Sequence, residues 1–219
     1  MTDRPILLDA CCGVGGATEG FRRAGFHVVG VDIAPQPDYP GDEFHQGDAV
    51  EFINRYGGDF AFIAASPPCQ AGCTLTAGTN RGRVYPQLIP DVREALLATG
   101  RPWSIENPPG RAPIRRDLML CGDMFPSLSV IRHRNFELHG VRIPQPAHVP
   151  HRGRVSGMRH GKWYQGPYVA VYGDGGGKGT VAQWQEAMGI DWTGVRVSIA
   201  EAIPPAYTEY IGRQLIDQL

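Results

Sequence analysis

Short apolar runs alternate with helix-like segments through the first half of the chain. Runs with the length and residue types of buried strands lie at residues 6–8, 27–32, 60–65 and 103–106. Segments with helical spacing lie between them, at residues 17–24, 49–55 and 87–99. Strand, glycine-rich turn, helix and strand in this order form the βαβ unit of a parallel sheet. The pattern therefore predicts an α/β fold.

The pattern changes at residue 140, where the chain becomes rich in proline, glycine, arginine and histidine. We interpret residues 140–167 as an insert built of loops rather than as a separate domain. A strand at 168–172 and helices at 181–188 and 205–218 are predicted to follow it. These features divide the chain into a core at 1–139, the insert at 140–167, and a C-terminal part at 168–219 that completes the core.

Composition places the chain among single-domain proteins without a membrane segment. Its 219 residues are 42% hydrophobic, enough for one core, and no apolar run reaches the roughly 18 residues of a spanning helix. The N-terminus lacks a signal-peptide pattern. Five cysteines, an odd number without framework spacing, indicate reduced thiols. These features predict a cytoplasmic protein.

The net charge of -1 conceals an uneven distribution along the chain. Residues 1–110 carry 8 Lys/Arg and 13 Asp/Glu, residues 111–162 carry 10 and 3, and residues 163–219 carry 3 and 6. A strongly basic middle part thus lies between two acidic parts. A nucleic acid could bind this basic part although the whole protein is not basic. The alternative is a solvated arginine-rich loop.

A glycine-rich turn, Asp-Ala-Cys-Cys-Gly-Val-Gly-Gly at residues 9–16, follows the first strand. Such a turn lets a ligand approach the backbone and precedes a helix with free N–H groups. Asp32 ends the second strand, where a carboxylate can accept both hydroxyls of a ribose. Asp48 follows a third strand, where a carboxylate can reach an adenine amino group. Because the sequence has no lysine-bearing phosphate loop, an adenosine ligand fits better than a triphosphate. A purely structural turn is the alternative.

Cys69 follows two prolines in Ser-Pro-Pro-Cys-Gln, at the end of the strand predicted at 60–65. The prolines fix the backbone where open α/β sheets place their chemistry, and a thiolate is the most nucleophilic side chain near neutral pH. A buried structural cysteine is the alternative. Cys73 raises a metal or redox alternative, but neither a second cysteine pair nor a compact histidine pair completes a zinc set. We therefore expect no metal site.

Two further groups carry candidate chemistry. Glu106 ends the strand predicted at 103–106, where a carboxyl group with a raised pKa can protonate or hydrogen-bond a ring nitrogen. Arg132 and Arg134 flank a histidine and could clamp a base carbonyl or a phosphate. The alternative for the first group is a turn cap, which suits Asn107 more than Glu106. The alternative for the arginines is a solvated charge run.

In their order along the chain, these motifs resemble those of the cytosine C5-specific DNA methyltransferases, in the compact form found in phage and prophage genomes. The resemblance covers nearly the whole chain and includes Ala-Ile-Pro-Pro-Ala-Tyr at 202–207, which is similar to the family's closing motif. It implies a Rossmann-like class I methyltransferase sheet with helices on both faces, and S-adenosyl-L-methionine as the cofactor. The cofactor-binding positions that it implies are Asp9, Cys11, Gly13, Gly15, Gly16, Asp32, Ile33, Asp48, Pro67 and Tyr207.

The resemblance also implies a reaction on cytosine. Cys69 would add to C6, while Glu106 would hydrogen-bond N3 and the exocyclic amine. Arg134 would hold O2, with Arg132 as the other arginine of the motif. A cytosine in duplex DNA would first leave the base stack. The implied activity is that of a DNA (cytosine-5-)-methyltransferase in a bacterial cell or phage-infected host, with a restriction-modification role.

Three departures from the family pattern keep alternatives open. Cys11 stands where the family has phenylalanine, Val130 stands where it has glutamine, and the insert at 140–167 is shorter than a usual recognition domain. The alternatives are the same chemistry on RNA or on a free cytosine nucleotide, and an inactive homologue that binds DNA or cofactor. The sequence leaves the target sequence and the oligomeric state open.

Overall fold

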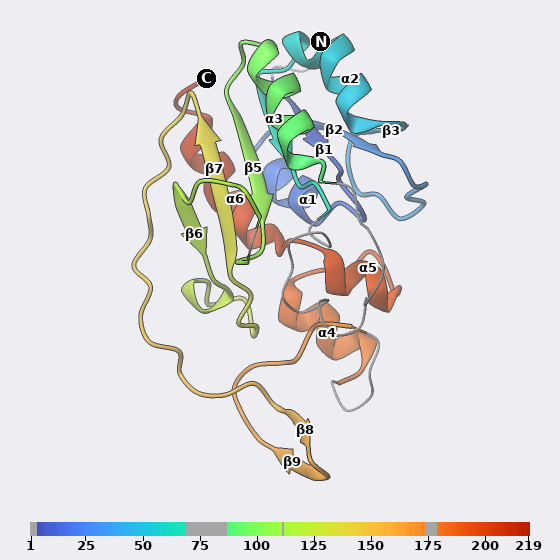
Figure 1. The fold of residues 1–219 in the computed structure, drawn as a ribbon. Coiled ribbons are helices and arrows are strands. Elements are labelled where there is room, and N and C mark those ends of the chain that lie inside the picture. Colours follow the sequence, from blue (N-terminus) through green and yellow to red (C-terminus); the bar gives the residue numbers. More distant parts are fainter. Residues whose placement is uncertain (1–3, 69–86, 111, 174–178) are drawn as a thin grey trace.

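A seven-stranded sheet forms the centre of the protein in the computed structural model, which describes residues 4–68, 87–110, 112–173 and 179–219 (Figure 1). The strand order is β3-β2-β1-β4-β5-β7-β6. β7 runs antiparallel to both of its neighbours, and the pairs from β3 to β5 are parallel. The strands are β1 (Ile6–Ala10), β2 (His27–Asp32), β3 (Glu43–Gln46), β4 (Phe62–Ala65), β5 (Trp103–Asn107), β6 (Leu118–Leu120) and β7 (Arg134–His139).

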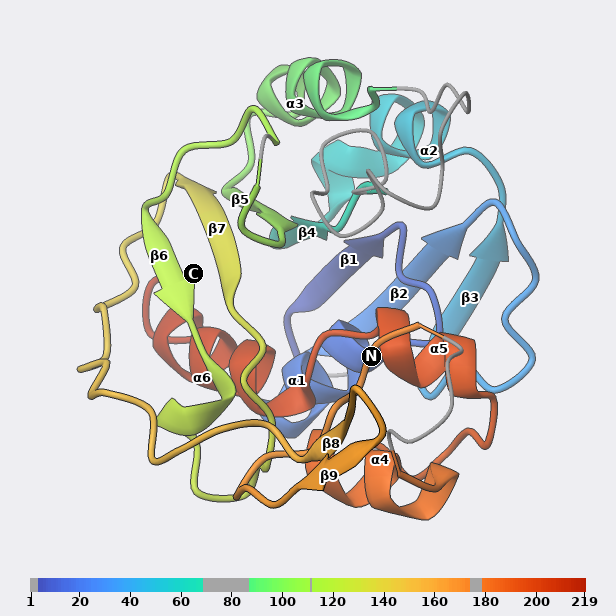
Figure 2. The ribbon, with the colours of Figure 1, turned by 60° about the horizontal axis from the view of Figure 1, so that its bottom comes forward.

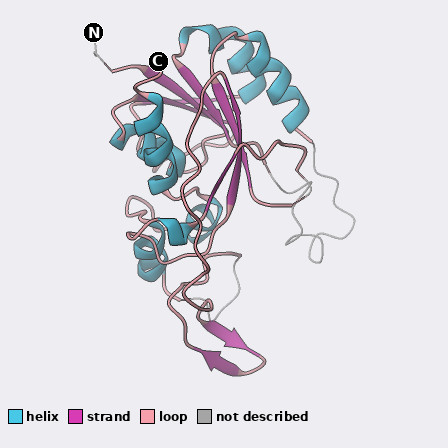
Figure 3. Cartoon of the chain, turned by 90° about the vertical axis from the view of Figure 1, so that its left-hand side faces the viewer, coloured by secondary structure: helices cyan, strands magenta, loops and turns pink. Residues whose placement is uncertain are grey.

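Helices cover both faces of the sheet, as Figure 3 shows. Because side chains alternate along a strand, Leu7 and Leu8 of β1 enter different cores. Leu8 lies in the core covered by α2 and α3, and Leu7 lies in the core that α1, α4 and α6 help to build. The helices are α1 (Gly16–Arg23), α2 (Ala49–Tyr56), α3 (Ile89–Ala98), α4 (Val181–Met188), α5 (Arg196–Glu201) and α6 (Pro205–Leu215), with 3-10 turns η1 (Gly57–Asp59) and η2 (Gly122–Met124).

The insert leaves the sheet after β7 and runs along its side as an extended chain. It carries a small antiparallel hairpin, β8 (Gly157–Arg159) and β9 (Lys162–Tyr164). The hairpin, α4 and α5 lie beyond the end of the sheet at which β7 begins (Figures 1 and 2). Since β5 runs antiparallel to β7, this is also the end at which β5 stops. No helix among the described residues is long and apolar enough to cross a membrane.

The prediction of an α/β sheet with helices on both faces is confirmed, but the predicted strand at 168–172 is wrong. Tyr168 forms only an isolated bridge with Val155, and the backbone N–H of Val169 donates to the carbonyl of Ser129. Tyr168, Ala170 and Val171 are buried and Tyr172 is exposed, but the segment does not join the sheet, because its backbone pairs with loops. The short strand β6, the strand β7 and helix α5 are additions to the predicted elements.

Candidate active site

Three of the predicted motifs follow adjacent strands that end at the same edge of the sheet. Ala10 of β1 pairs with Ala65 of β4, and Ala65 pairs with Ile105 of β5, so the three strand ends are level. The glycine turn follows β1, and the Pro-Pro-Cys-Gln segment follows β4. Glu106 is the second-to-last residue of β5. Cys69 itself lies outside the described residues. The described residues that precede Cys69 in this segment begin at this edge of the sheet.

The glycine turn uses backbone conformations that suit glycine. Gly13 and Gly15 have φ values of 50° and 81°, and Cys11 has φ 58°. A Cβ on Gly16 would lie 2.3 Å from the backbone oxygen of Ile203, so only glycine lets α1 begin this close to the C-terminal segment. A Cβ on Gly13 would meet nothing within 4 Å. The turn thus presents open space at Gly13 beside a tightly packed helix start.

Acidic and apolar side chains lie beside this open space. One carboxylate oxygen of Asp32 accepts a hydrogen bond from the N–H of Gly13, and the other accepts from the N–H of Ala34, both at 2.9 Å. The next residue, Ile33, is 72% exposed. Asp48 is exposed and caps α2 by accepting from the N–H of Glu51 at 2.9 Å. Open space, an exposed apolar side chain and two carboxylates fit an adenosine-bearing ligand, which the residues predicted from sequence could hold here.

Asp9 lies beneath the turn, fully buried, rather than on its ligand-facing surface. One of its carboxyl oxygens accepts a hydrogen bond of 2.6 Å from the hydroxyl of Thr18, and the other has no hydrogen-bond partner among the described residues. Burial raises the pKa of Asp9 to about 7, and the nearby charge of Asp32 adds to the rise. Burial and the same carboxylate raise the pKa of Cys11 to about 12, so its thiol stays protonated and is a poor nucleophile.

Glu106 and Arg134 form a buried ion pair where β5 ends and β7 begins. The Nε atom of Arg134 lies 2.7 Å from Oε1 of Glu106, and both side chains are almost fully buried. Burial raises the pKa of Glu106, while the charges of Arg134 and Arg132 oppose that rise. The site therefore holds a carboxyl group that takes up a proton more readily than an exposed glutamate.

Asn107, which follows Glu106 in β5, connects this strand to the start of the Pro-Pro-Cys-Gln segment. Its buried side-chain amide donates a hydrogen bond of 3.0 Å to the carbonyl of Pro67. In addition, the N–H of Ser66 donates to the carbonyl of Ala10 at 3.0 Å. The start of the Pro-Pro-Cys-Gln segment is thus fixed to β1 on one side and to β5 on the other. Pro67 contacts the site through its carbonyl, and its predicted contact with a cofactor stays a prediction.

Arg132 and Tyr207 link the segment before β7 to the C-terminal part of the chain. The guanidinium of Arg132 donates hydrogen bonds to the backbone carbonyls of Val171, at 3.0 Å, and Ala200. The hydroxyl of the fully buried Tyr207 donates to the backbone carbonyl of Arg132 at 2.6 Å. These contacts tie the start of β7 to the C-terminal part of the chain. The predicted catalytic role of Arg132 and cofactor role of Tyr207 stay predictions, and the contacts observed are structural.

One cluster of side chains was missed by the reasoning from sequence. Cys121, His133, His148 and His151 place their ligand atoms within 4.8 Å of one another. Reading the sequence for compact cysteine or histidine pairs finds no metal set, because these four residues are spread over 31 positions. Only the His-x-x-His spacing at 148–151 could have signalled the cluster.

Comparisons with known proteins identify the fold. No protein-family model matches the sequence, and no curated protein matches it. Among solved structures, the Dnmt2 methyltransferase of S. pombe superposes with a TM-score of 0.64 at 12% identity, over 98% of this chain and 99% of that one. The chain has a methyltransferase fold.

Two further structures share this methyltransferase fold along nearly their whole length. One is the methyltransferase EhMeth of Entamoeba histolytica, with a TM-score of 0.59 at 10% identity over 99% of both chains. The other is described as a DNA modification methyltransferase encoded within a prophage (E. coli), with a TM-score of 0.56 at 14% identity over 97% of this chain and 99% of that one. The class of fold predicted from the sequence motifs is thereby confirmed.

Proposed function

We propose that this protein methylates C5 of cytosine in DNA, using S-adenosyl-L-methionine and a covalent bond between Cys69 and C6 of the base. The observation that carries the proposal is the buried pair of Glu106 and Arg134, joined through Asn107 to the start of the Cys69 segment. A proton-binding carboxyl group and an arginine lie at one edge of a methyltransferase fold, and Cys69 follows in sequence a strand that ends at this edge. This is the set of groups that chemistry at a pyrimidine ring requires.

Each residue has a defined role in the proposed reaction. The Cys69 thiolate adds to C6, and Glu106 donates a proton or hydrogen bond at N3, which stabilises the negative charge that develops on the ring. Arg134, beside Glu106, holds the O2 carbonyl. S-Adenosyl-L-methionine, when bound, supplies the methyl group that C5 takes up. A base then removes the C5 proton, and the electron pair of that bond expels the Cys69 thiolate and restores the aromatic ring.

The cofactor would be held by the glycine turn and the two strands beside it. The open space at Gly13 leaves room for the ligand, and the exposed side chain of Ile33 can pack against an adenine ring. Asp32 can accept the ribose hydroxyls, and Asp48 can accept the adenine amino group. The fully buried Asp9 supports the turn instead of forming part of this surface.

Nucleic acid is the proposed substrate because the basic part of the chain reaches the active-site end of the sheet. The hairpin β8–β9 lies at this end (Figure 1) and exposes Trp163 and Met158. Arg154 and Lys162 lie over the ring of Tyr164, at 5.4 Å and 5.8 Å from its centre. Cationic and aromatic side chains on one protrusion are suited to phosphates and unstacked bases. The small size of this insert motivates the alternative substrates, RNA or a free cytosine nucleotide, with the same chemistry.

A transfer assay tests this proposal directly. The protein is incubated with S-adenosyl-L-methionine labelled in the methyl group and, in separate reactions, with duplex DNA, tRNA and dCMP. We expect label at C5 of cytosine in DNA, loss of transfer in Cys69→Ser, and near-normal transfer in the matched control Cys73→Ser. Label only in tRNA or dCMP would move the activity to that substrate, and label in none of them would contradict the proposal.

A further inference from the structure

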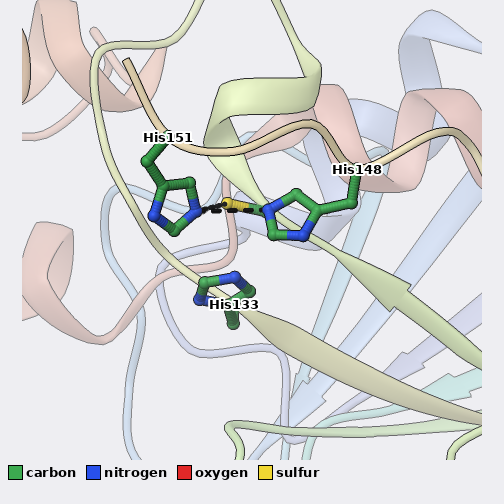
Figure 4. A group of neighbouring side chains, drawn as sticks. His133, His148 and His151 are labelled. Atoms are coloured by element: carbon green, nitrogen blue, oxygen red, sulfur yellow. Dashed lines mark hydrogen bonds between the residues drawn. The ribbon is translucent and has the colours of Figure 1, made fainter. Parts of the chain in front are cut away.

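Four side chains with metal-binding atoms converge where the insert passes the end of β6 and the start of β7. Cys121 directly follows β6 and His133 directly precedes β7, while His148 and His151 lie on the extended chain of the insert. One ligand atom from each lies within 4.8 Å of every other. Figure 4 shows the three imidazole rings turned toward one another around a sulfur atom. Segments far apart in sequence thus meet through their donor atoms.

Two of the separations between ligand atoms match the edges of a tetrahedral metal site. Nε2 of His151 lies 3.2 Å from Nε2 of His148 and 3.4 Å from Sγ of Cys121. With Zn–N of about 2.05 Å and Zn–S of about 2.3 Å, a tetrahedron places two nitrogens about 3.3 Å apart and a nitrogen and a sulfur about 3.6 Å apart. The remaining pairs, all within 4.8 Å, need to close by at most about 1.5 Å, which rotation of a partly exposed imidazole such as His133 supplies.

Hydrogen bonding alone explains this arrangement poorly. A ring nitrogen carries either one hydrogen or one lone pair, so Nε2 of His151 cannot donate to one neighbour while it accepts from the other. The ring centres of the three histidines are 5.1–5.2 Å apart in every pairing, which places mutually repelling imidazoles together if they are protonated. A single cation that accepts lone pairs from all four groups resolves both difficulties.

The surroundings of the cluster resemble the outer shell of a metal site. Cys121 is fully buried, with the backbone N–H groups of Asp123 and Arg132 near its sulfur. Such donors stabilise a metal-bound thiolate. The carboxylate of Asp123 lies close enough to His151 to interact with it and is held at 2.8 Å by Arg152. A buried sulfur with its own donors, beside histidines and a carboxylate, is the environment expected of a metal site.

We propose that Cys121, His133, His148 and His151 bind one Zn²⁺ ion in a closed, four-coordinate structural site. One thiolate and three imidazoles suit zinc, and four protein ligands leave no open position for catalysis. The inference goes beyond the proposed methyl transfer and does not depend on it.

The position of the proposed site indicates that the metal would have a structural role. Two ligands belong to the ends of β6 and β7, and two belong to the insert, so the ion would cross-link the insert to the sheet. His133 is also the neighbour of Arg134, whose guanidinium donates a 3.0 Å hydrogen bond to the His133 carbonyl. Zinc would thereby fix the insert relative to the arginine that pairs with Glu106. A small insert without a large core of its own gains rigidity from such a cross-link.

Metal analysis and cobalt substitution of the full chain test the site. We expect one zinc per chain after dialysis against buffer. Replacement of zinc by Co²⁺ should give the visible bands of a tetrahedral site and a thiolate-to-cobalt charge-transfer band. Cys121→Ser should lose the charge-transfer band. His148→Ala, a change at an exposed side chain, should weaken zinc binding at least about 100-fold in competition with a chelating dye.

His160→Asn is the matched control, because His160 lies in the same insert outside the cluster and has a positive φ that asparagine tolerates. It should keep both the zinc and the cobalt spectrum of the wild type. Zinc-free wild-type protein that takes up no stoichiometric zinc or cobalt would overturn the proposal. A charge-transfer band that persists in Cys121→Ser and disappears in a Cys69→Ser/Cys73→Ser variant would also overturn it. Metal analysis that finds copper instead of zinc in the protein would overturn it as well. None of these readouts requires methyltransferase activity.

Discussion

Replacing Asp9 by asparagine should change how the stability of the fold depends on pH. Burial raises the pKa of this carboxyl group from 3.8 to about 7 in the folded protein. A raised folded pKa means that the native state binds the proton more tightly than the unfolded chain. The contribution of Asp9 to stability is therefore fully present below about pH 4 and is lost as the pH rises through about 7.

The size of the effect follows from the shift. Each pKa unit corresponds to about 1.4 kcal/mol, so a shift from 3.8 to about 7 corresponds to about 4 kcal/mol. The side chain is fully buried, so solvent screening does not reduce this value greatly. Asp9→Asn keeps the shape and an oxygen that can accept from Thr18, but it does not titrate. Relative to this variant, the wild type should lose about 4 kcal/mol of unfolding free energy between pH 4 and pH 7.5.

Urea unfolding followed by circular dichroism at closely spaced pH values measures this difference. Other titrating groups contribute equally to both proteins and cancel in the difference when they lie far from the site. Asp38→Asn, at an exposed aspartate, serves as the matched control and should run parallel to the wild type. A flat difference between wild type and Asp9→Asn, or one that grows in favour of the wild type with rising pH, would refute the reasoning.

Three further changes test the packing around the site. Gly16→Ala should destabilise the protein by about 1–3 kcal/mol in urea unfolding, because the new methyl group would lie 2.3 Å from a backbone oxygen. Glu106→Gln should cost about 3–5 kcal/mol and lower the Tm by about 6 °C or more, because it leaves Arg134 buried without its partner. Arg134→Met should cost less, because Glu106 can take up a proton whereas arginine cannot lose one. Asn107→Ala removes a buried 3.0 Å hydrogen bond to the Cys69 segment and should lower kcat about tenfold, with the KM for DNA changed less than about twofold.

Each of these expectations has a comparison that can contradict it. Gly47→Ala adds a methyl group that meets nothing within 4 Å, so equal losses of stability for Gly16→Ala and Gly47→Ala would exclude a steric cause. Equal losses for Glu106→Gln and Arg134→Met would contradict the asymmetry of the buried pair. A rise in KM with unchanged kcat for Asn107→Ala would mean that the bond serves substrate binding and does not position the cysteine segment.

Elements with a strong local signal could be predicted from the sequence. The apolar run of β2 gave its bounds, His27–Asp32, and α4 spans Val181–Met188 as predicted, because Thr180 and Gln183 form a capping box at its start. The order of the motifs also indicated which strand ends meet. Local signals of this kind act over a few residues and do not depend on the rest of the fold.

The strand β7 was missed because its burial depends on distant partners. Glu137 is 1% exposed in the middle of this strand, and a buried glutamate contradicts a strand pattern read locally. Its charge is satisfied by Arg93 at 2.7 Å and Arg115 at 2.9 Å, which are 44 and 22 residues away in the sequence. These ion pairs hold the pKa of Glu137 below its usual value, although burial alone would raise it.

The candidate site was predicted in its residue types and incompletely in its contacts. Glu106 and Arg134 were both singled out, but their 2.7 Å pairing requires β7 to lie next to β5, which the sequence pattern did not indicate. Arg132 was grouped with Arg134 because both flank one histidine. In the structure the two guanidinium groups have different partners, because Arg132 binds backbone carbonyls of two later segments that only the tertiary fold brings near.

Trapping of the covalent intermediate tests the central claim most directly. Duplex DNA that contains 5-fluorocytosine is incubated with the protein and S-adenosyl-L-methionine, because fluorine at C5 cannot leave as a proton does and the Cys69–C6 bond then persists. The account predicts a complex that survives denaturation, with the base attached to the peptide that contains Cys69, and no such complex for Cys69→Ser. A complex that forms equally well with Cys69→Ser would contradict the assignment of the nucleophile. The absence of any complex with DNA that the protein binds would contradict the reaction itself.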